Sequence, residues 1–165
     1  MKEPLFYGED QMKEMYLAAG SFWEAQLSLD AVHGVLATFV GYMGGFAPNP
    51  TYKQVLSGKT GHAQTVKVLY DEDVISYADL TNCFFEIHNP TALNNHGQSD
   101  GSAFNSILFY QDEKEREIAQ KAKALFNLYN RYHQVALTQI KPVDIFYPAE
   151  EVHQHFIEKR WHLFC

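Results

Sequence analysis

The chain has 165 residues, of which 46% are hydrophobic and 15% aromatic, and its formal net charge is −7. This is enough apolar material for one domain, residues 1–165, to bury a core without disulfide bonds. The acidic and basic residues are interspersed, whereas a protein that binds nucleic acid or an anionic membrane needs a clustered basic face, so neither partner is expected.

The sequence alternates strand and helix signals. In chain order the predicted elements are a strand at 14–19, a helix at 22–32, a strand at 35–40, a loop at 41–50, a helix at 51–56, a strand at 66–70, a helix from Ser76 to about His88, a strand at 106–110 and a helix from Asp112 to Tyr132. Apolar residues at helical spacing predict the helices at 22–32 and 112–132, and β-branched residues in alternation with Lys67 predict the strand at 66–70. The pattern implies an α/β, two-layer sandwich, with one mixed sheet covered by helices.

Local signals mark the element boundaries. Gly20 ends the first strand, which makes Ser21 the expected N-cap of the helix that follows. The glycines and prolines of 41–50 break both helix and strand. Residues 151–155 look like part of a C-terminal helix, on which histidines two positions apart do not share a face. A metal site made by Glu151, His153 and His155 is therefore not expected.

The chain carries no signal of secretion. Its first 16 residues lack the basic end and apolar run of a signal peptide, and no apolar stretch has the length of a membrane span. We therefore expect a cytoplasmic location, in which Cys83 and Cys165 are both thiols. Cys83 lies in an apolar helix segment and is expected to fill space in the core.

Four separated motifs point to one family. They are Gly20-Ser21-Phe22-Trp23-Glu24, Gly41-Tyr42-Met43-Gly44-Gly45, Pro50-Thr51-Tyr52 and Thr60-Gly61-His62-Ala63-Gln64. Together they resemble peptide methionine sulfoxide reductase A, over roughly residues 16–165. The resemblance implies a ferredoxin-like core, an N-terminal extension at 1–13 and a C-terminal segment, 148–165, near the site. It also implies a thiol reductant such as thioredoxin, with no cofactor and no metal.

The resemblance assigns a chemistry that this sequence does not fully match. In the family a cysteine thiolate attacks the sulfoxide sulfur and a glutamic acid protonates the oxygen, and this chain has Ser21 and Gln64 in these positions. A helix N-terminus lowers the pKa of a thiol, but the same help leaves a hydroxyl un-ionised. An amide donates a hydrogen bond but releases no proton. Oxygen transfer to a serine oxygen would also form a weak O–O bond.

Two further functional positions differ. The family's aspartate corresponds to Ser99, with Asp100 one residue away, and a tyrosine corresponds to Phe104. The resolving thiol keeps its position as Cys165, but it has no partner to resolve. Since four positions change while the scaffold motifs stay, we favour a natural, repurposed or inactive homologue over an engineered inactive form.

A binding pocket is also implied by the resemblance. Phe22 and Trp23 match the aromatic pair that encloses the methyl group of a methylsulfinyl side chain, and Tyr52 matches a phenol that hydrogen-bonds the sulfoxide oxygen. Phe104 belongs with these substrate-binding positions. The Gln64 amide can still donate a hydrogen bond to the same oxygen.

Two functions from different classes remain open. The first is a non-catalytic module that binds methionine sulfoxide, free or in a peptide, or a related methyl-sulfur group. The second is an enzyme, either a methionine-S-sulfoxide reductase whose nucleophile is relocated to Cys165, with thioredoxin as its partner, or a different reaction at Ser21. A hydrolase made from Ser21, His62 and Asp100 is disfavoured, because the glycine pattern of a nucleophile elbow is missing around Ser21.

Overall fold

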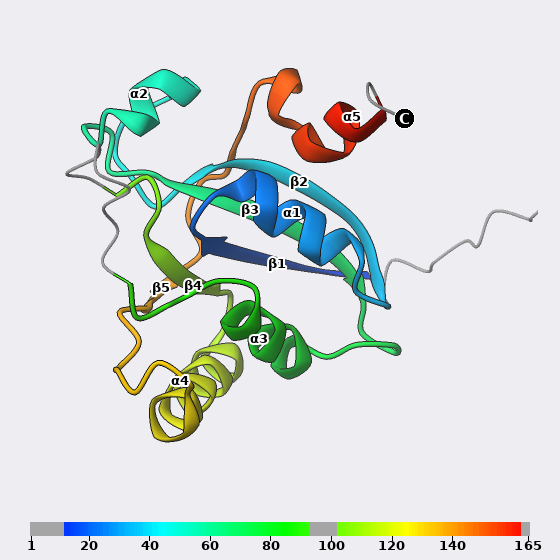
Figure 1. Cartoon of the computed structure of the whole chain (residues 1–165), viewed down its shortest axis with the longest axis vertical. Helices are drawn as coiled ribbons and strands as arrows, with labels where there is room; N and C mark the ends of the chain where they lie inside the picture. The colour runs from blue at the N-terminus through cyan, green and yellow to red at the C-terminus, as the bar shows by residue number, and fades with distance from the viewer. Residues whose placement is uncertain (1–11, 93–101, 163–165) are drawn as a thin grey trace, which may run out of the picture.

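The computed structural model describes residues 12–92 and 102–162. Its elements are β1 (Met12–Ala19), α1 (Phe22–Asp30), β2 (Val35–Met43), α2 (Tyr52–Leu56), β3 (Ala63–Asp71), α3 (Tyr77–Glu86), β4 (Ser106–Tyr110), α4 (Glu113–Tyr129), β5 (Gln139–Pro142), β6 (Tyr147–Pro148), the 3₁₀ helix η1 (Glu151–His153) and α5 (Phe156–His162). In Figure 1, α1 crosses the sheet, α3 and α4 lie side by side, and α5 lies next to α1 at the opposite end of the molecule from α4.

The six strands form one mixed sheet in the order β5-β4-β1-β3-β2-β6. The pairs within the central four strands are antiparallel, and β5 runs parallel to β4 at one edge. Helix α1 connects β1 to β2 and α3 connects β3 to β4, which makes the central order β4-β1-β3-β2 a ferredoxin-like unit. The predicted fold class, an α+β arrangement around a mixed sheet, is confirmed.

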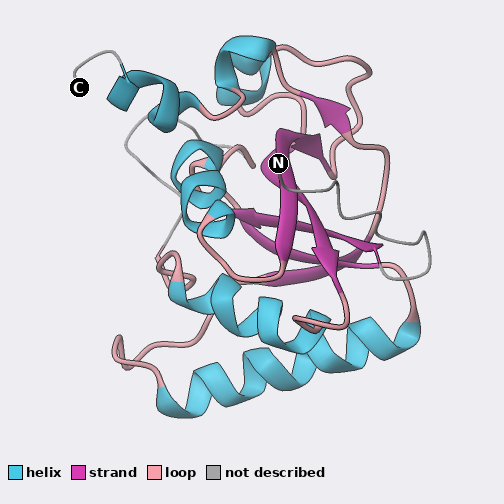
Figure 2. Ribbon diagram, turned by 90° about the vertical axis from the view of Figure 1, so that its right-hand side faces the viewer, coloured by secondary structure: helices cyan, strands magenta, loops and turns pink. Residues whose placement is uncertain are grey.

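The period-2 alternation of β1 divides the core between the two faces of the sheet. Met15 and Leu17 point into the larger cluster, which α1, α3 and α4 cover. Tyr16 and Ala18 point into a smaller cluster on the other face, where Phe146 packs against them. Figure 2 shows the long helices gathered on one side of the strands. No helix in the described parts of the chain is long and apolar enough to cross a membrane.

The structure corrects several predicted boundaries. Residues 41–43 continue β2 instead of starting a loop, because they pair with β3 and, in part, with β6. Gly41 is required there, since a Cβ would collide with the carbonyl oxygen of Tyr147. Strands β5 and β6 were not predicted. Residues 151–155 are not one helix, because η1 ends at His153 and α5 begins at Phe156.

Candidate functional site

The site begins at the turn from β1 into α1. Gly20 has φ +77°, a left-handed conformation that glycine adopts without strain. The turn places Ser21 at the N-cap position of α1, with extended backbone, as predicted. Its side chain makes no capping hydrogen bond, so the hydroxyl does not do what an N-cap serine usually does.

Gln64 of β3 caps the helix instead. It is 1% exposed, and its Oε1 accepts a hydrogen bond from the backbone N–H of Phe22 at 3.1 Å. Because an N–H can donate only to the oxygen, this contact fixes the orientation of the amide and directs Nε2 away from the helix. Nε2 is buried and makes no hydrogen bond with the residues that the structure describes. Burial raises the pKa of the Tyr52 hydroxyl, and the nearby Gln64 Nε2, although its contact falls short of normal hydrogen-bond geometry, partly offsets this rise.

A cavity of about 620 Å³ opens beside Ser21. Four of the residues assigned to the site line it, namely Ser21, Trp23, Tyr52 and Phe104. Phe22 and Gln64 do not line it. Phe22 is fully buried beneath it and stacks on Tyr52 at 6.0 Å between ring centroids, so it supports the cavity wall instead of forming it. The volume lies within the range of pockets for small molecules.

The C-terminal part of the described chain fixes the aromatic wall. Trp23 stacks on Phe156 with 4.0 Å between ring centroids, and Tyr52 stacks on His153 at 4.1 Å. Trp23 Nε1 donates a hydrogen bond to His153 Nδ1 at 3.1 Å. Since an indole nitrogen only donates, this His153 nitrogen must be unprotonated. Burial lowers the pKa of His153, which agrees with a neutral ring.

Glu150 connects two tyrosines behind this wall. Its carboxylate accepts hydrogen bonds from the Tyr42 hydroxyl at 2.9 Å and from the Tyr52 backbone N–H at 3.1 Å. Partial burial raises the pKa of Glu150, but its own backbone N–H, these two bonds and the nearby His153 together lower the pKa overall. Burial raises the pKa of Tyr42 and of Tyr52, so both phenols stay protonated at neutral pH.

A half-buried histidine borders the cavity on the other side. The ring of His88 places Nδ1 2.7 Å from the Phe84 carbonyl oxygen and Nε2 2.8 Å from the Ser106 hydroxyl. The carbonyl accepts only, so Nδ1 carries the proton and Nε2 accepts from Ser106. Burial lowers the pKa of His88 to about 4. This wall of the cavity therefore carries no charge at neutral pH.

Sequence reasoning missed Glu150, the site contacts of His153, and Phe156. These residues come from short elements near the C-terminus, where no periodic pattern and no quoted motif marked them. Ser99 and Cys165, assigned to the site by the resemblance, lie outside the described residues, as does Asp100.

The sequence is similar to well-defined relatives. The family model described as Peptide methionine sulfoxide reductase matches residues 13–165. Peptide methionine sulfoxide reductase MsrA 1 of Nostoc sp. is 41% identical over 152 residues, which cover 92% of this chain and 93% of that protein. MsrA of Methanothermobacter thermautotrophicus is 42% identical over 141 residues, covering 86% of this chain and 83% of that protein.

The fold is also similar to that of solved structures. Mxr1 from Saccharomyces cerevisiae in reduced form matches with a TM-score of 0.82 at 29% identity, covering 96% of this chain and 91% of that one. The same yeast protein in complex with Trx2 matches with a TM-score of 0.65 at 25% identity, covering 92% and 90%. Since the family model spans nearly the whole chain and the relatives exceed 40% identity over most of their length, this chain belongs to the peptide methionine sulfoxide reductase family.

Proposed function

We propose that this chain binds a methylsulfinyl group, and more weakly a thioether, without reducing it at an appreciable rate. The observation that carries the proposal is the buried Gln64 amide, with Oε1 committed to the Phe22 N–H and Nε2 facing the Tyr52 hydroxyl without a hydrogen bond of normal geometry. A buried donor left unpaired costs about 1–3 kcal/mol. A sulfoxide oxygen is an acceptor that would satisfy it.

Gln64 supports binding in the way that a protonated glutamic acid does. Its N–H occupies the place of the acid's O–H and donates a hydrogen bond in the same direction. The difference lies in the reaction, because an amide does not transfer its proton to the oxygen when the S–O bond breaks. General acid catalysis of this kind contributes about 10²–10⁴-fold to a rate. The substitution therefore retains recognition and removes a catalytic step.

Ser21 removes the nucleophile. Its hydroxyl stands where the family carries a cysteine, and the N-terminus of α1 cannot ionise it at neutral pH. A partly apolar cavity remains beside it, with Trp23 and Phe104 in the wall and Glu24 as the one acidic residue among the described residues that line it. Burying a methyl group there yields roughly 25 cal/mol per Å² of apolar area removed from water. We expect modest affinity for a small neutral ligand.

The proposal covers the whole chain as one domain in a reducing, cytoplasmic setting, with methionine sulfoxide, free or in a peptide, as the ligand. Mxr1 is seen with Trx2 in the yeast complex. A thioredoxin partner follows for this chain only if it has redox activity.

Calorimetry with three probes tests the binding. N-acetyl-methionine S-sulfoxide should bind best, N-acetyl-methionine about tenfold more weakly, and N-acetyl-norleucine, which lacks both sulfur and oxygen, more weakly still. The order follows from the unpaired Gln64 donor. Equal affinity for all three probes contradicts a site that recognises the sulfinyl oxygen.

Dithiothreitol-dependent formation of methionine tests the catalytic half. We expect none above background with the unaltered chain. Turnover that disappears in Cys165→Ser would instead support the relocated-thiol enzyme, and turnover that survives Cys165→Ser would point to another reaction at the site.

A further inference from the structure

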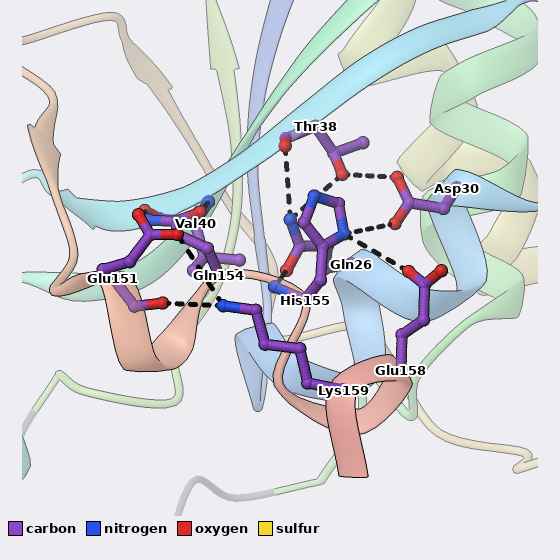
Figure 3. Close-up of polar contacts among 9 residues, drawn as sticks. All are labelled: Gln26, Asp30, Thr38, Val40, Glu151, Gln154, His155, Glu158 and Lys159. Atoms are coloured by element: carbon purple, nitrogen blue, oxygen red, sulfur yellow. Dashed lines mark hydrogen bonds and ion pairs between the residues drawn. The ribbon is translucent and has the colours of Figure 1, made fainter. Parts of the chain in front are cut away.

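A second cluster of chemically active side chains lies outside the cavity, where α5 meets the end of α1. Figure 3 shows Asp30, His155 and Glu158 converging on one point. His155 Nδ1 lies 3.0 Å from Asp30 Oδ2 and 3.7 Å from Glu158 Oε2. One ligand atom from each residue lies within 4.8 Å of the other two. The cluster joins residues more than a hundred positions apart in the sequence.

The hydrogen bonding behind Asp30 holds its carboxylate in place. Gln26 Nε2 donates to the Thr38 hydroxyl at 3.1 Å, and that hydroxyl donates to Asp30 Oδ1. Gln26 is 1% exposed and Thr38 is 2% exposed, so the chain of donors is buried. The other carboxylate oxygen, Oδ2, is left to face His155. Outer contacts of this kind orient the ligands of metal sites.

His155 is held by its backbone. Its N–H donates to Gln26 Oε1 at 2.7 Å, so the same glutamine orients both Asp30 and His155. Neither carboxylate of the cluster forms an ion pair with Lys or Arg among the described residues, and Lys159 is paired with Glu151. Two carboxylates thus face one imidazole nitrogen. A single N–H on Nδ1 can donate a good hydrogen bond to only one of these carboxylates, whereas a divalent cation between the three side chains would bind both.

We propose that Asp30, His155 and Glu158 form a binding site for a divalent transition-metal ion of the Zn²⁺ class. Imidazole nitrogen with two carboxylates suits Zn²⁺ better than Ca²⁺ or Mg²⁺, which prefer oxygen ligands alone. Around a tetrahedral zinc, ligand atoms lie about 3.3 Å apart. The observed separations of His155 Nδ1 from Asp30 (3.0 Å) and from Glu158 (3.7 Å) bracket this value. The third separation, between the Asp30 and Glu158 carboxylates, is within 4.8 Å, and the exposed Glu158 side chain can move to shorten it.

The bound ion clips α5 to α1. Phe156, the first residue of α5, stacks on Trp23 in the wall of the cavity, and His155 and Glu158 flank it in the sequence. The ion therefore holds in place the segment that supports the aromatic wall. This inference does not depend on what the cavity binds.

Zinc titration of the full chain by calorimetry tests the site. The wild-type protein should bind one Zn²⁺ per chain, and His155→Ala and Glu158→Gln should each weaken binding by at least about tenfold. Glu158 is exposed, so its variant keeps the fold even if His155→Ala does not. His33→Ala, another exposed histidine, is the matched control and should bind as the wild type does. Absence of binding, or equal binding by all four proteins, overturns the site.

Two spectroscopic readouts complete the test. Co²⁺ bound to one nitrogen and two oxygen ligands gives no thiolate charge-transfer band, so the appearance of that band assigns the ion to a cysteine and overturns the proposal. Hydrogen exchange of the α5 amides should slow on adding Zn²⁺ to the wild type but not to Glu158→Gln. If Zn²⁺ leaves the exchange of these amides unchanged in the wild type, the ion does not hold α5 against α1, and this part of the proposal is wrong.

Discussion

Gln64 Oε1 accepts the backbone N–H of Phe22 at 3.1 Å, so a side chain from β3 satisfies the first free donor of α1. The contact joins two elements that are 42 positions apart in the chain. It gives Gln64 a structural role in addition to its proposed role toward a ligand.

Removing this cap should destabilise the fold. Gln64→Ala leaves the buried Phe22 N–H without its partner, which costs about 1–3 kcal/mol. The free energy of unfolding from urea denaturation measures it. Gln54→Ala, which removes an exposed glutamine from α2, provides a control of equal size and should cost less. An equal decrease in the free energy of unfolding in the two variants would show that the buried Gln64–Phe22 contact stabilises the fold no more than an exposed glutamine does.

Restoring two groups should restore reductase chemistry. Ser21→Cys with Gln64→Glu supplies a thiol at the N-terminus of α1 and a proton donor beside Tyr52, and should exceed Ser21→Cys alone by about 10²–10⁴-fold. Dithiothreitol-dependent formation of methionine measures both. If Ser21→Cys alone matches the double variant, Gln64 does not limit the reaction.

The Tyr52 hydroxyl should contribute to recognition without supporting the fold. Tyr52→Phe keeps the ring stacked on His153 but removes the O–H, so sulfoxide affinity should fall by about 3–10-fold, the worth of one neutral hydrogen bond. Calorimetry and circular dichroism measure the two effects separately. Tyr129→Phe, on the exposed side of α4, is the matched control. An unchanged affinity in Tyr52→Phe would place the sulfoxide away from this phenol.

Acidification should destabilise the protein through His88. Its pKa is about 4 in the folded state against an ordinary 6.5, so the unfolded chain takes up a proton first as the pH falls. The contribution is fully present above pH 6.5 and declines between pH 6.5 and about 4, by about 3 kcal/mol. His88→Gln should remove this part of the pH dependence, and His33→Gln should retain it. The same dependence in wild type and His88→Gln would show that the His88 imidazole does not have the lowered pKa on which this prediction rests.

The sequence predicted the regular parts of this fold, and four of the residues that the resemblance assigns to the site line the cavity. Alternation in β3 and helical spacing in α4 extend over enough residues to be recognised. The glycine before Ser21 marks the turn that places it. Edge strands β5 and β6 have four and two residues and too little pattern to detect. Their positions are set by pairing with distant strands, which no local signal records.

The same limit applies to side-chain contacts. The Gln64 substitution was visible, but its capping of Phe22 depends on the distance between β3 and the start of α1. His153 and His155 were expected on one helix. They lie on either side of its break and serve different clusters, one with Trp23 and one with Asp30.

Because Phe156 and His153 lie near the C-terminus, the ribosome synthesises the central sheet before it synthesises the residues that support the aromatic wall. The ferredoxin-like strands and helices are complete once residue 110 has left the ribosome, whereas the residues that hold Trp23 and Tyr52 in place emerge only some forty positions later. A nascent or truncated chain that has formed its central sheet therefore exposes an aromatic surface without a finished binding wall. A ligand that needs this wall is therefore expected to bind only after the C-terminal residues have been synthesised.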